Sequence, residues 1–121
     1  MFVSVLINGQ TVPALLDTGA THNFISKDEI KCLGFKATQY GGTIKAVNSS
    51  AKPFTGTAQG VHVTLGTWNE KLDFSIVSMD DYTVIIGREF FDKVHAFPFP
   101  ATNSLSIFDG SKAWVVPIER A

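Results

Sequence analysis

The sequence predicts an all-β domain that folds as a small closed or nearly closed barrel-like sheet. Short runs rich in β-branched and aromatic residues recur along the 121 residues, separated by glycine, asparagine and proline turn signals. We expect about eight or nine strands and only two short helices, the latter read from helical spacing and end signals. Strands and helices do not alternate, so the rhythm of a parallel βαβ sheet is missing.

Length and composition point to one domain spanning residues 1–121. Apolar residues make up 45% and charged residues 17%, which is typical of a globular chain. The net charge of −1 and the lack of a basic run argue against nucleic-acid binding, and no apolar run approaches the roughly 20 residues that span a bilayer. The single Cys32 cannot form an internal disulfide, so we expect a cytoplasmic, reducing environment and a buried thiol.

The first two strands are predicted to form a hairpin that ends at a carboxylate. The runs Phe2–Ile7 and Thr11–Leu16 flank Asn8-Gly9-Gln10, and Asn-Gly between such runs is a strong hairpin signal. Pro13 suggests that the second strand is partly unpaired at that point. The hairpin therefore places Asp17 at the end of a buried strand.

A carboxylate at that place needs a partner or a shared proton, because a lone buried charge is costly. Thr18 can hydrogen-bond neighbouring backbone groups, and Gly19 permits a sharp turn or a close backbone approach. By itself, Asp-Thr-Gly is also typical of an Asx-type turn that closes a strand, and a triplet of the form Asp-(Ser/Thr)-Gly occurs by chance in roughly one chain in twenty of this length.

A short helix is expected next, over about 27–33. Ser26 and Glu29 have the spacing of a capping box, and Gly34 is a helix-ending residue. The following segment is poor in large apolar groups, and Thr43–Val47 and Lys52–Thr55 are predicted to form a second hairpin around 48–50. This hairpin is either an exposed surface element or a mobile flap, residues 43–57, over an active site.

Two alternating strands are predicted at Val61–Leu65 and Leu72–Ile76, joined by a turn at Gly66–Glu70. His62 falls on the polar face of its strand. The three histidines have no ligand spacing, so no metal site is expected.

In the last third of the chain we expect one buried strand, then one helix, and then a final hairpin. The apolar strand Tyr82–Ile86 ends at Gly87, and Arg88–Val94 follows with helical spacing. The helix should bury Phe90, Phe91 and Val94. Pro98 and Pro100 indicate an irregular link, followed by a hairpin of Ser104–Phe108 and Ala113–Ile118 around Asp109-Gly110.

The segments Leu15–Ala20 and Val84–Arg88, some 65 residues apart with a hairpin between them, resemble the paired motifs of the retropepsins. These are the aspartic proteases of retroviruses and long-terminal-repeat retrotransposons. The string Asp17–Ile25 is most similar to the gypsy-type branch, and the resemblance extends from about Phe2 to Ile118. It implies an acid-protease fold, homodimeric, with a peptide or polyprotein substrate bound as an added strand.

The resemblance also implies a role for each matching residue. Asp17 would be the catalytic residue, and Thr18, Gly19 and Ala20 would complete the active-site loop. The substrate-binding residues would be Thr21, His22, Ala46, Val47, Asn48 and Ile86, and the structural motif would comprise Ile85, Gly87 and Arg88. No cofactor, metal, nucleic acid or membrane is implied.

The active-site loop departs from the retroviral pattern at two positions. Retroviral members usually carry acidic residues where this chain has Thr21 and His22. Those acids bind the substrate backbone and pair with the arginine that matches Arg88. In this chain Arg88 has no obvious carboxylate partner in the loop.

Peptide hydrolysis by carboxylates needs two of them, one to accept a proton from water and one to donate to the carbonyl oxygen. The chain has one Asp-Thr-Gly and no internal repeat, which predicts a homodimer with the site on its two-fold axis. Two other interpretations are a domesticated or inactive domain that dimerises and only binds peptides, and an unrelated β-barrel binding module. The intact motif residues favour an active peptidase that processes its own polyprotein.

Overall fold

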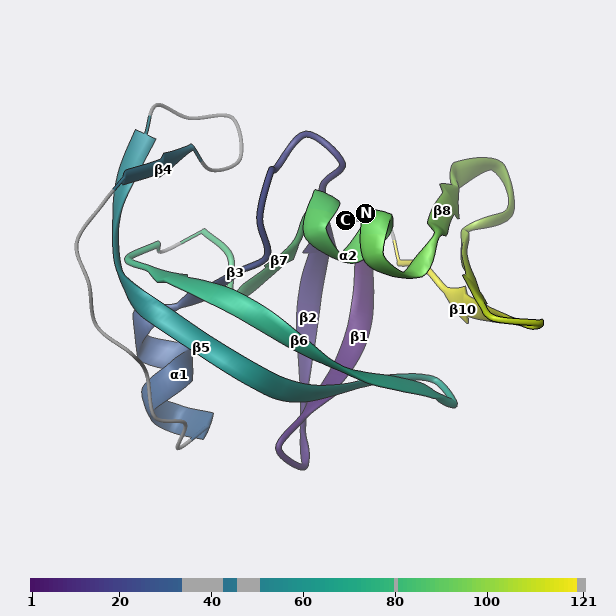
Figure 1. The fold of residues 1–121 in the computed structure, drawn as a ribbon, viewed down its shortest axis with the longest axis horizontal. Coiled ribbons are helices and arrows are strands. Elements are labelled where there is room, and N and C mark those ends of the chain that lie inside the picture. The colour runs from purple at the N-terminus through teal and green to yellow at the C-terminus, as the bar shows by residue number, and fades with distance from the viewer. Residues whose placement is uncertain (34–42, 46–50, 80, 120–121) are drawn as a thin grey trace.

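The computed structural model describes residues 1–33, 43–45, 51–79 and 81–119 and shows a closed barrel with a small separate sheet at one end (Figure 1). The barrel strands are β1 (Phe2–Ile7), β2 (Gln10–Leu16), β3 (Phe24–Ser26), β5 (Ala51–Leu65), β6 (Trp68–Val77) and β7 (Val84–Ile86). The predicted all-β, barrel-like class is confirmed.

The barrel closes because the first strand pairs on both sides. The order is β1-β2-β7-β3-β6-β5, and β5 returns to β1 through the pairs Leu6↔Thr64 and Ile7↔Val63. Most neighbours are antiparallel, but β2 pairs with β7 and β3 with β6 in parallel. These parallel pairs bring the ends of β2 and β7 to the same edge of the barrel, where Asp17 follows β2 and Gly87 follows β7.

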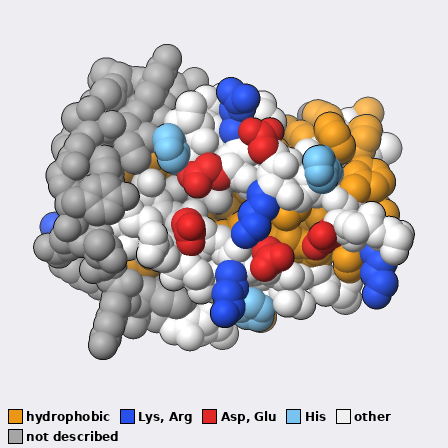
Figure 2. All heavy atoms as spheres, viewed as in Figure 1, with side chains coloured by type: hydrophobic (Ala, Val, Ile, Leu, Met, Phe, Trp, Pro, Cys, Tyr) orange, Lys and Arg blue, Asp and Glu red, His pale blue; other side chains and the backbone are white. Residues whose placement is uncertain are grey.

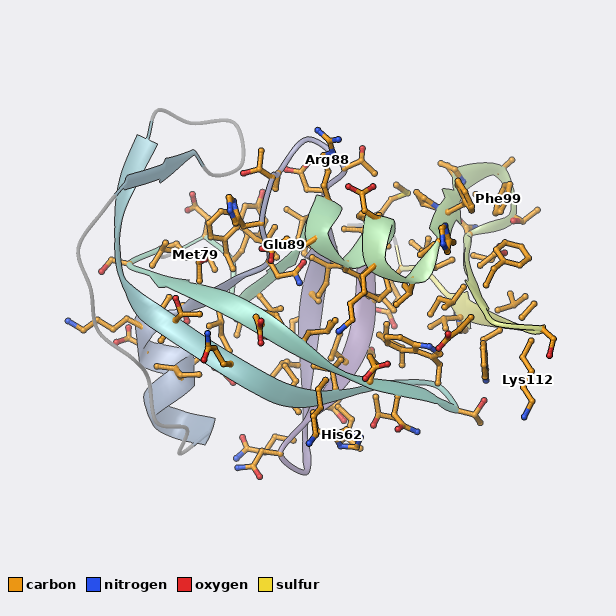
Figure 3. All side chains as sticks on the ribbon, in the orientation of Figure 1. His62, Met79, Arg88, Glu89, Phe99 and Lys112 are labelled. Carbon is orange, nitrogen blue, oxygen red and sulfur yellow. The ribbon has the colours of Figure 1, made fainter. Side chains whose placement is uncertain are left out.

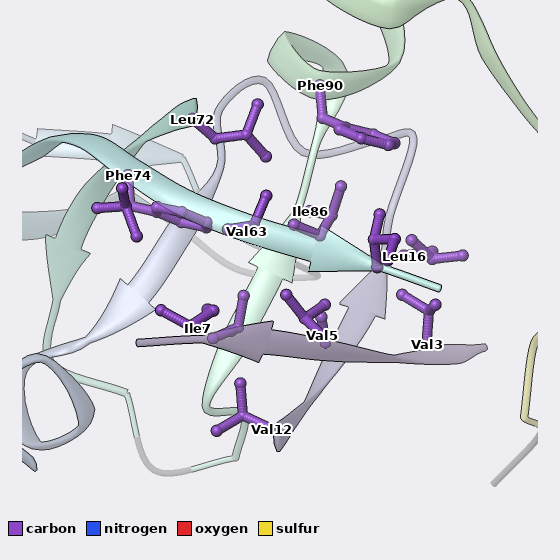
Figure 4. Close-up of a cluster of buried hydrophobic side chains, with 14 of the residues drawn as sticks. Val3, Val5, Ile7, Val12, Leu16, Val63, Leu72, Phe74, Ile86 and Phe90 are labelled. Atoms are coloured by element: carbon purple, nitrogen blue, oxygen red, sulfur yellow. The ribbon is translucent and has the colours of Figure 1, made fainter. Parts of the chain in front are cut away.

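The barrel interior is filled by the side chains that alternate inward along each strand. In β1, Val3, Val5 and Ile7 are buried, and Phe74 on β6 and Phe90 on helix α2 (Arg88–Val94) pack in the same cluster (Figure 4). A second, smaller buried cluster contains Ala20, Phe24, Val77 and Ile85.

The first hairpin forms as predicted. Asn8 and Gly9 both have positive φ, 49° and 79°, as a two-residue type I′ turn requires. The prediction for Pro13 is also confirmed, because β7 joins the open side of β2 only from Ala14 onward.

Both helices lie where the sequence predicted them. In α1 (Lys27–Leu33) the Ser26 hydroxyl oxygen accepts a hydrogen bond from the Glu29 N–H at 3.1 Å. The expected end at Gly34 and the side chain of Cys32 lie outside the described residues. In α2 (Arg88–Val94) the three expected side chains are buried: Phe90, Phe91 and Val94.

The middle of the chain differs from the prediction in two ways. Lys52–Thr55 and Val61–Leu65 belong to one strand, β5, which bends at register shifts near Gly56 and Gly60 instead of breaking. The predicted turn Gly66–Glu70 is shorter, because Trp68 is buried in β6 and opposes Leu65. Burial of this indole favours extending the strand up to the turn.

The predicted second hairpin is partly within the described residues. Strand β4 (Thr43–Lys45) pairs with β5 from Thr43↔Pro53 to Lys45↔Ala51. The tip, including Ala46, Val47 and Asn48, lies outside the described residues.

The C-terminal segment forms a three-stranded sheet of β8 (Ala96–Phe99), β9 (Ser104–Asp109) and β10 (Lys112–Pro117), with a 3-10 turn at Pro100–Thr102. The predicted irregular link is therefore wrong for Pro98, which lies in β8, and confirmed for Pro100, which begins the 3-10 turn between β8 and β9. Strand β8 is an edge strand, and the bond from the Phe108 N–H to the His95 carbonyl fixes a register in which the nitrogen of Pro98 faces the open edge.

Strand β10 pairs with β9 within the same chain, and Glu119 exchanges two backbone hydrogen bonds of 2.7 Å with Phe2. The hairpin predicted from Ser104–Phe108 and Ala113–Ile118 is therefore formed within one chain.

We expect Phe90→Ala to destabilise the domain by about 3–5 kcal/mol, because Phe90 is fully buried and packs edge-to-face on Trp68 at 5.6 Å. Urea unfolding followed by tryptophan fluorescence would measure the loss. Leu6→Ala, on a half-exposed strand position, is the control and should change stability by less than about 1 kcal/mol. Equal losses in the two variants would contradict the assigned core.

Candidate active site

Asp17 lies directly after β2 and continues the pairing of that strand with β7. Its N–H donates to the Ile86 carbonyl at 3.0 Å, next to the paired residues Leu16 and Ile86. Its side-chain Oδ1 accepts a hydrogen bond from the Gly19 N–H at 2.8 Å. The carboxylate is thus oriented by the backbone of its own loop, while the residue stays partly exposed.

The loop packs against the residue that follows β7. A β-carbon at Gly87 would lie 2.7 Å from the Ala20 carbonyl oxygen and even closer to that of His22, so only glycine fits. The next residue, Arg88, donates its N–H to the Ala20 carbonyl at 2.9 Å. The two motifs that the sequence singled out therefore meet through backbone contact.

Asn23 is a functional-site candidate that the sequence analysis missed. Its side-chain oxygen accepts the Gly87 N–H at 2.9 Å, and its own N–H donates to Glu89 Oε1 at 3.1 Å. It is buried, with 1% of its surface exposed. The only signal in the sequence was a polar residue between the loop and the apolar Phe24-Ile25.

The predicted substrate-binding residues are placed differently from one another. Thr21 is exposed, and its hydroxyl lies 2.7 Å from Nδ1 of the half-buried His22. The Ile86 side chain is in the barrel core, so its contact with substrate stays a prediction, as do those of Ala46, Val47 and Asn48 outside the described residues.

Apolar side chains beside the loop were also missed. Leu15 and Tyr82 are partly buried and pack against the cluster that contains Ala20 and Ile85. Leu15 lies two residues before Asp17 on β2, so this apolar surface begins close to the carboxylate.

Arg88 is exposed at the start of α2 and is directed away from the barrel (Figure 3). It lines a pocket of about 410 Å³ together with Thr18, His95, Phe97 and Pro98, among others. Within the part of the chain that the structure describes, its guanidinium has no hydrogen-bond or ion-pair partner.

The described residues contain neither a candidate metal site nor a candidate membrane-spanning helix. No cluster of three or more metal-ligating side chains occurs there. None of the helices described is long and apolar enough to cross a membrane.

A single carboxylate held in this way can accept a proton from water. It cannot at the same time donate a proton to a carbonyl oxygen, which needs a second acid. The described residues contain one such loop, so a mechanism that needs both groups at once would require a second carboxylate from outside it.

One comparison with known proteins identifies a family. A sequence model described as gag-polyprotein putative aspartyl protease matches residues 3–93. No curated protein matches the chain at a significant level.

Two solved structures show the same fold. The retroviral protease-like domain of Ddi1 from Leishmania major has a TM-score of 0.76 and 20% identity, over 100% of this chain and 97% of that one. The EIAV protease, solved with the inhibitor HBY-793, has a TM-score of 0.63 and 21% identity, over 77% of this chain and 86% of that one.

We expect Gly87→Ala to prevent folding or lower stability by more than about 3 kcal/mol, because its β-carbon meets two backbone carbonyls that cannot move independently. Gly19→Ala is the matched control. Its β-carbon would meet only Asp17 Oδ1, at 3.1 Å, so the variant should fold and disturb that carboxylate alone. Thermal unfolding of both proteins measures the difference, and a stable Gly87→Ala variant would refute the close contact.

Proposed function

The chain belongs to the gag-polyprotein putative aspartyl protease family, and on that basis we propose that it is an active aspartic endopeptidase with Asp17 as its catalytic carboxylate. The observation that carries the proposal is the local geometry of Asp17. A strand end paired with β7 holds its backbone, and the Gly19 N–H orients its side chain.

The proposed reaction uses two copies of Asp17, one from each chain of a homodimer. Carboxylates about 3 Å apart share one proton, because both cannot ionise cheaply. The ionised carboxylate takes a proton from water as the oxygen attacks the peptide carbonyl, and the protonated one donates to the carbonyl oxygen. When the C–N bond breaks, the leaving amine takes a proton from the protonated carboxyl group, and a hydroxyl of the tetrahedral intermediate returns a proton to the other carboxylate. The dyad again holds one proton, so the proposed steps need no metal ion or cofactor.

A surface next to the loop supports the proposed homodimer. Phe97, Phe99, Phe108 and Val115 point to one side of the C-terminal sheet, with Phe97 53% and Val115 71% exposed. Figure 2 shows hydrophobic side chains gathered at this end of the molecule. Phe97 also lines the pocket that reaches Thr18, so the apolar surface is continuous with the loop that the second copy must meet.

We propose an extended peptide of a polyprotein as the substrate, in the cytoplasm. Such a peptide would lie between Leu15 and Tyr82 on one side and the β4–β5 hairpin, acting as a flap, on the other. The alternative is a dimerising peptide-binding domain without catalysis. The intact motif, with Asp17 and Gly87 both present, favours hydrolysis.

Asp17→Asn should lower peptidase activity by at least about a hundredfold while the fold is kept, because it removes the general base and the shared proton. The measurement is cleavage of a peptide library, read by mass spectrometry, with circular dichroism as the folding control. Asp73→Asn, in the middle of β6, is a matched carboxylate control and should stay active. Turnover by purified Asp17→Asn protein near the wild-type rate would exclude the assignment.

Specific activity should fall on dilution, because the two-carboxylate site exists only in the dimer.

Phe97→Ser should raise the dimer dissociation constant at least about tenfold, since burial of an aromatic ring contributes a few kcal/mol. Sedimentation of Phe97→Ser and of a control variant, Leu6→Ser, each in the Asp17→Asn background, measures association without catalysis. Leu6→Ser, an exposed apolar position away from this sheet, is the control, and equal dissociation constants for the two would reject this interface.

A further inference from the structure

We propose that Glu89 is a positioning residue for Asp17, acting through Asn23. This inference rests on the proposed function and assigns a role to an exposed acidic residue on α2 that neither motif includes. The two residues are called the Asn23–Glu89 pair below.

Asn23 connects the active-site loop to Gly87, to Glu89 on α2 and to strand β6. Besides its bonds to Gly87 and Glu89, its side-chain Nδ2 donates to the Asp73 carbonyl at 3.4 Å. Its own carbonyl accepts the Ser75 N–H at 2.8 Å. Every polar group of this buried residue is therefore bonded, and its position is fixed as long as each partner stays in place.

Glu89 supplies the one ionisable partner in this set. Its carboxylate accepts the N–H of Asn23, which is a charge-assisted bond and stronger than a bond between neutral groups. Arg88 and Glu89 are neighbours in sequence but point to different sides of α2 (Figure 3). Glu89 faces the loop, whereas Arg88 is directed away from the barrel.

Three hydrogen bonds connect the Asn23–Glu89 pair to the backbone of Asp17, which carries the carboxylate. The Asn23 side chain holds the Gly87 N–H, and Arg88 N–H holds the Ala20 carbonyl. Ala20 N–H in turn donates to the Asp17 carbonyl at 3.2 Å. Releasing Asn23 from Glu89 loosens the exit of the loop, while β2 still holds its entry, and a small displacement of a catalytic group has a large effect on rate.

The fold itself does not depend on Glu89. Its side chain is exposed, and the core of α2 is formed by Phe90, Phe91 and Val94. Removal of the carboxylate should therefore change the position of the loop more than the stability of the domain.

The test compares three variants of the full chain: Glu89→Ala, Glu89→Gln and Asp28→Ala. Gln keeps an acceptor for the Asn23 N–H without the charge. Asp28 is an exposed acid in the first turn of α1, so its removal controls for the general effect of an acid near a helix start. Glu89→Met, which has similar length and no oxygen acceptor, replaces the alanine variant if that one does not fold.

In kinetics, Glu89→Ala should lower kcat about ten- to a hundredfold with KM changed by less than about threefold, because positioning acts on the reacting groups and not on substrate binding. Glu89→Gln should recover most of kcat, and Asp28→Ala should match the wild type. A fall in kcat no larger than that of Asp28→Ala, or no recovery with Gln, would overturn the proposal.

Amide NMR provides a readout that does not require activity. In Glu89→Ala, the amide of Asn23 should exchange at least about tenfold faster, and the amide of Gly19, which reports on Asp17 Oδ1, should shift. Unchanged Asn23 and Gly19 signals would overturn the proposal even in an active enzyme. If the wild type cleaves no peptide while these signals move as expected, the proposed function fails and the role of the pair in holding the loop stands.

Discussion

The contact between Gly87 and the carbonyl oxygens of Ala20 and His22 is the constraint on which the rest of the site depends. Two backbone segments, one after β2 and one after β7, approach so closely that no β-carbon fits between them. This approach is possible because β2 and β7 run parallel and end at the same edge of the barrel. The loop that orients the Asp17 carboxylate is therefore itself fixed against the barrel.

Once the two segments touch, the polar groups between them need partners in a place with little water. The buried Asn23 and the backbone groups of Ala20 and Arg88 meet that need in pairs. The acid of this set comes from α2, as Glu89, and it bonds a loop N–H. This arrangement leaves the Arg88 guanidinium without a partner among the described residues, facing the pocket beside Thr18.

The surface of the chain carries a group of exposed hydrophobic side chains beside the pocket that reaches Thr18. Among the residues whose side chains are described, the large exposed hydrophobic ones other than Leu6 lie on one side of the C-terminal sheet. Such a concentration on a small β domain is unusual unless another surface covers it. Its continuity with the pocket beside Thr18 links the proposed association of two chains to the chemistry that requires it.

The sequence alone determined those features that depend on neighbours along the chain. The Asn8-Gly9 turn, the cap of α1 at Ser26 and the buried stripe of α2 follow from local backbone preferences and periodicity, and all three were predicted. The Asp17 and Gly87 motifs were identified differently, through their resemblance to the retropepsins, which was visible because each motif is a contiguous string. One local signal gave a wrong prediction. Pro98 was expected in an irregular link, although it lies in an edge strand, where no hydrogen bond is lost at that position.

Tertiary structure alone decided which distant residues meet. Nothing along the chain relates Asn23 to Glu89, 66 residues away, because that hydrogen bond exists only after β3, β6 and β7 have paired. The union of two predicted strands into β5 likewise depended on the length of β6 beside it, since a long partner strand lets a bulged chain stay hydrogen-bonded. Periodicity and turn chemistry are local, whereas the partners of a buried polar group are chosen by the packing of the whole barrel.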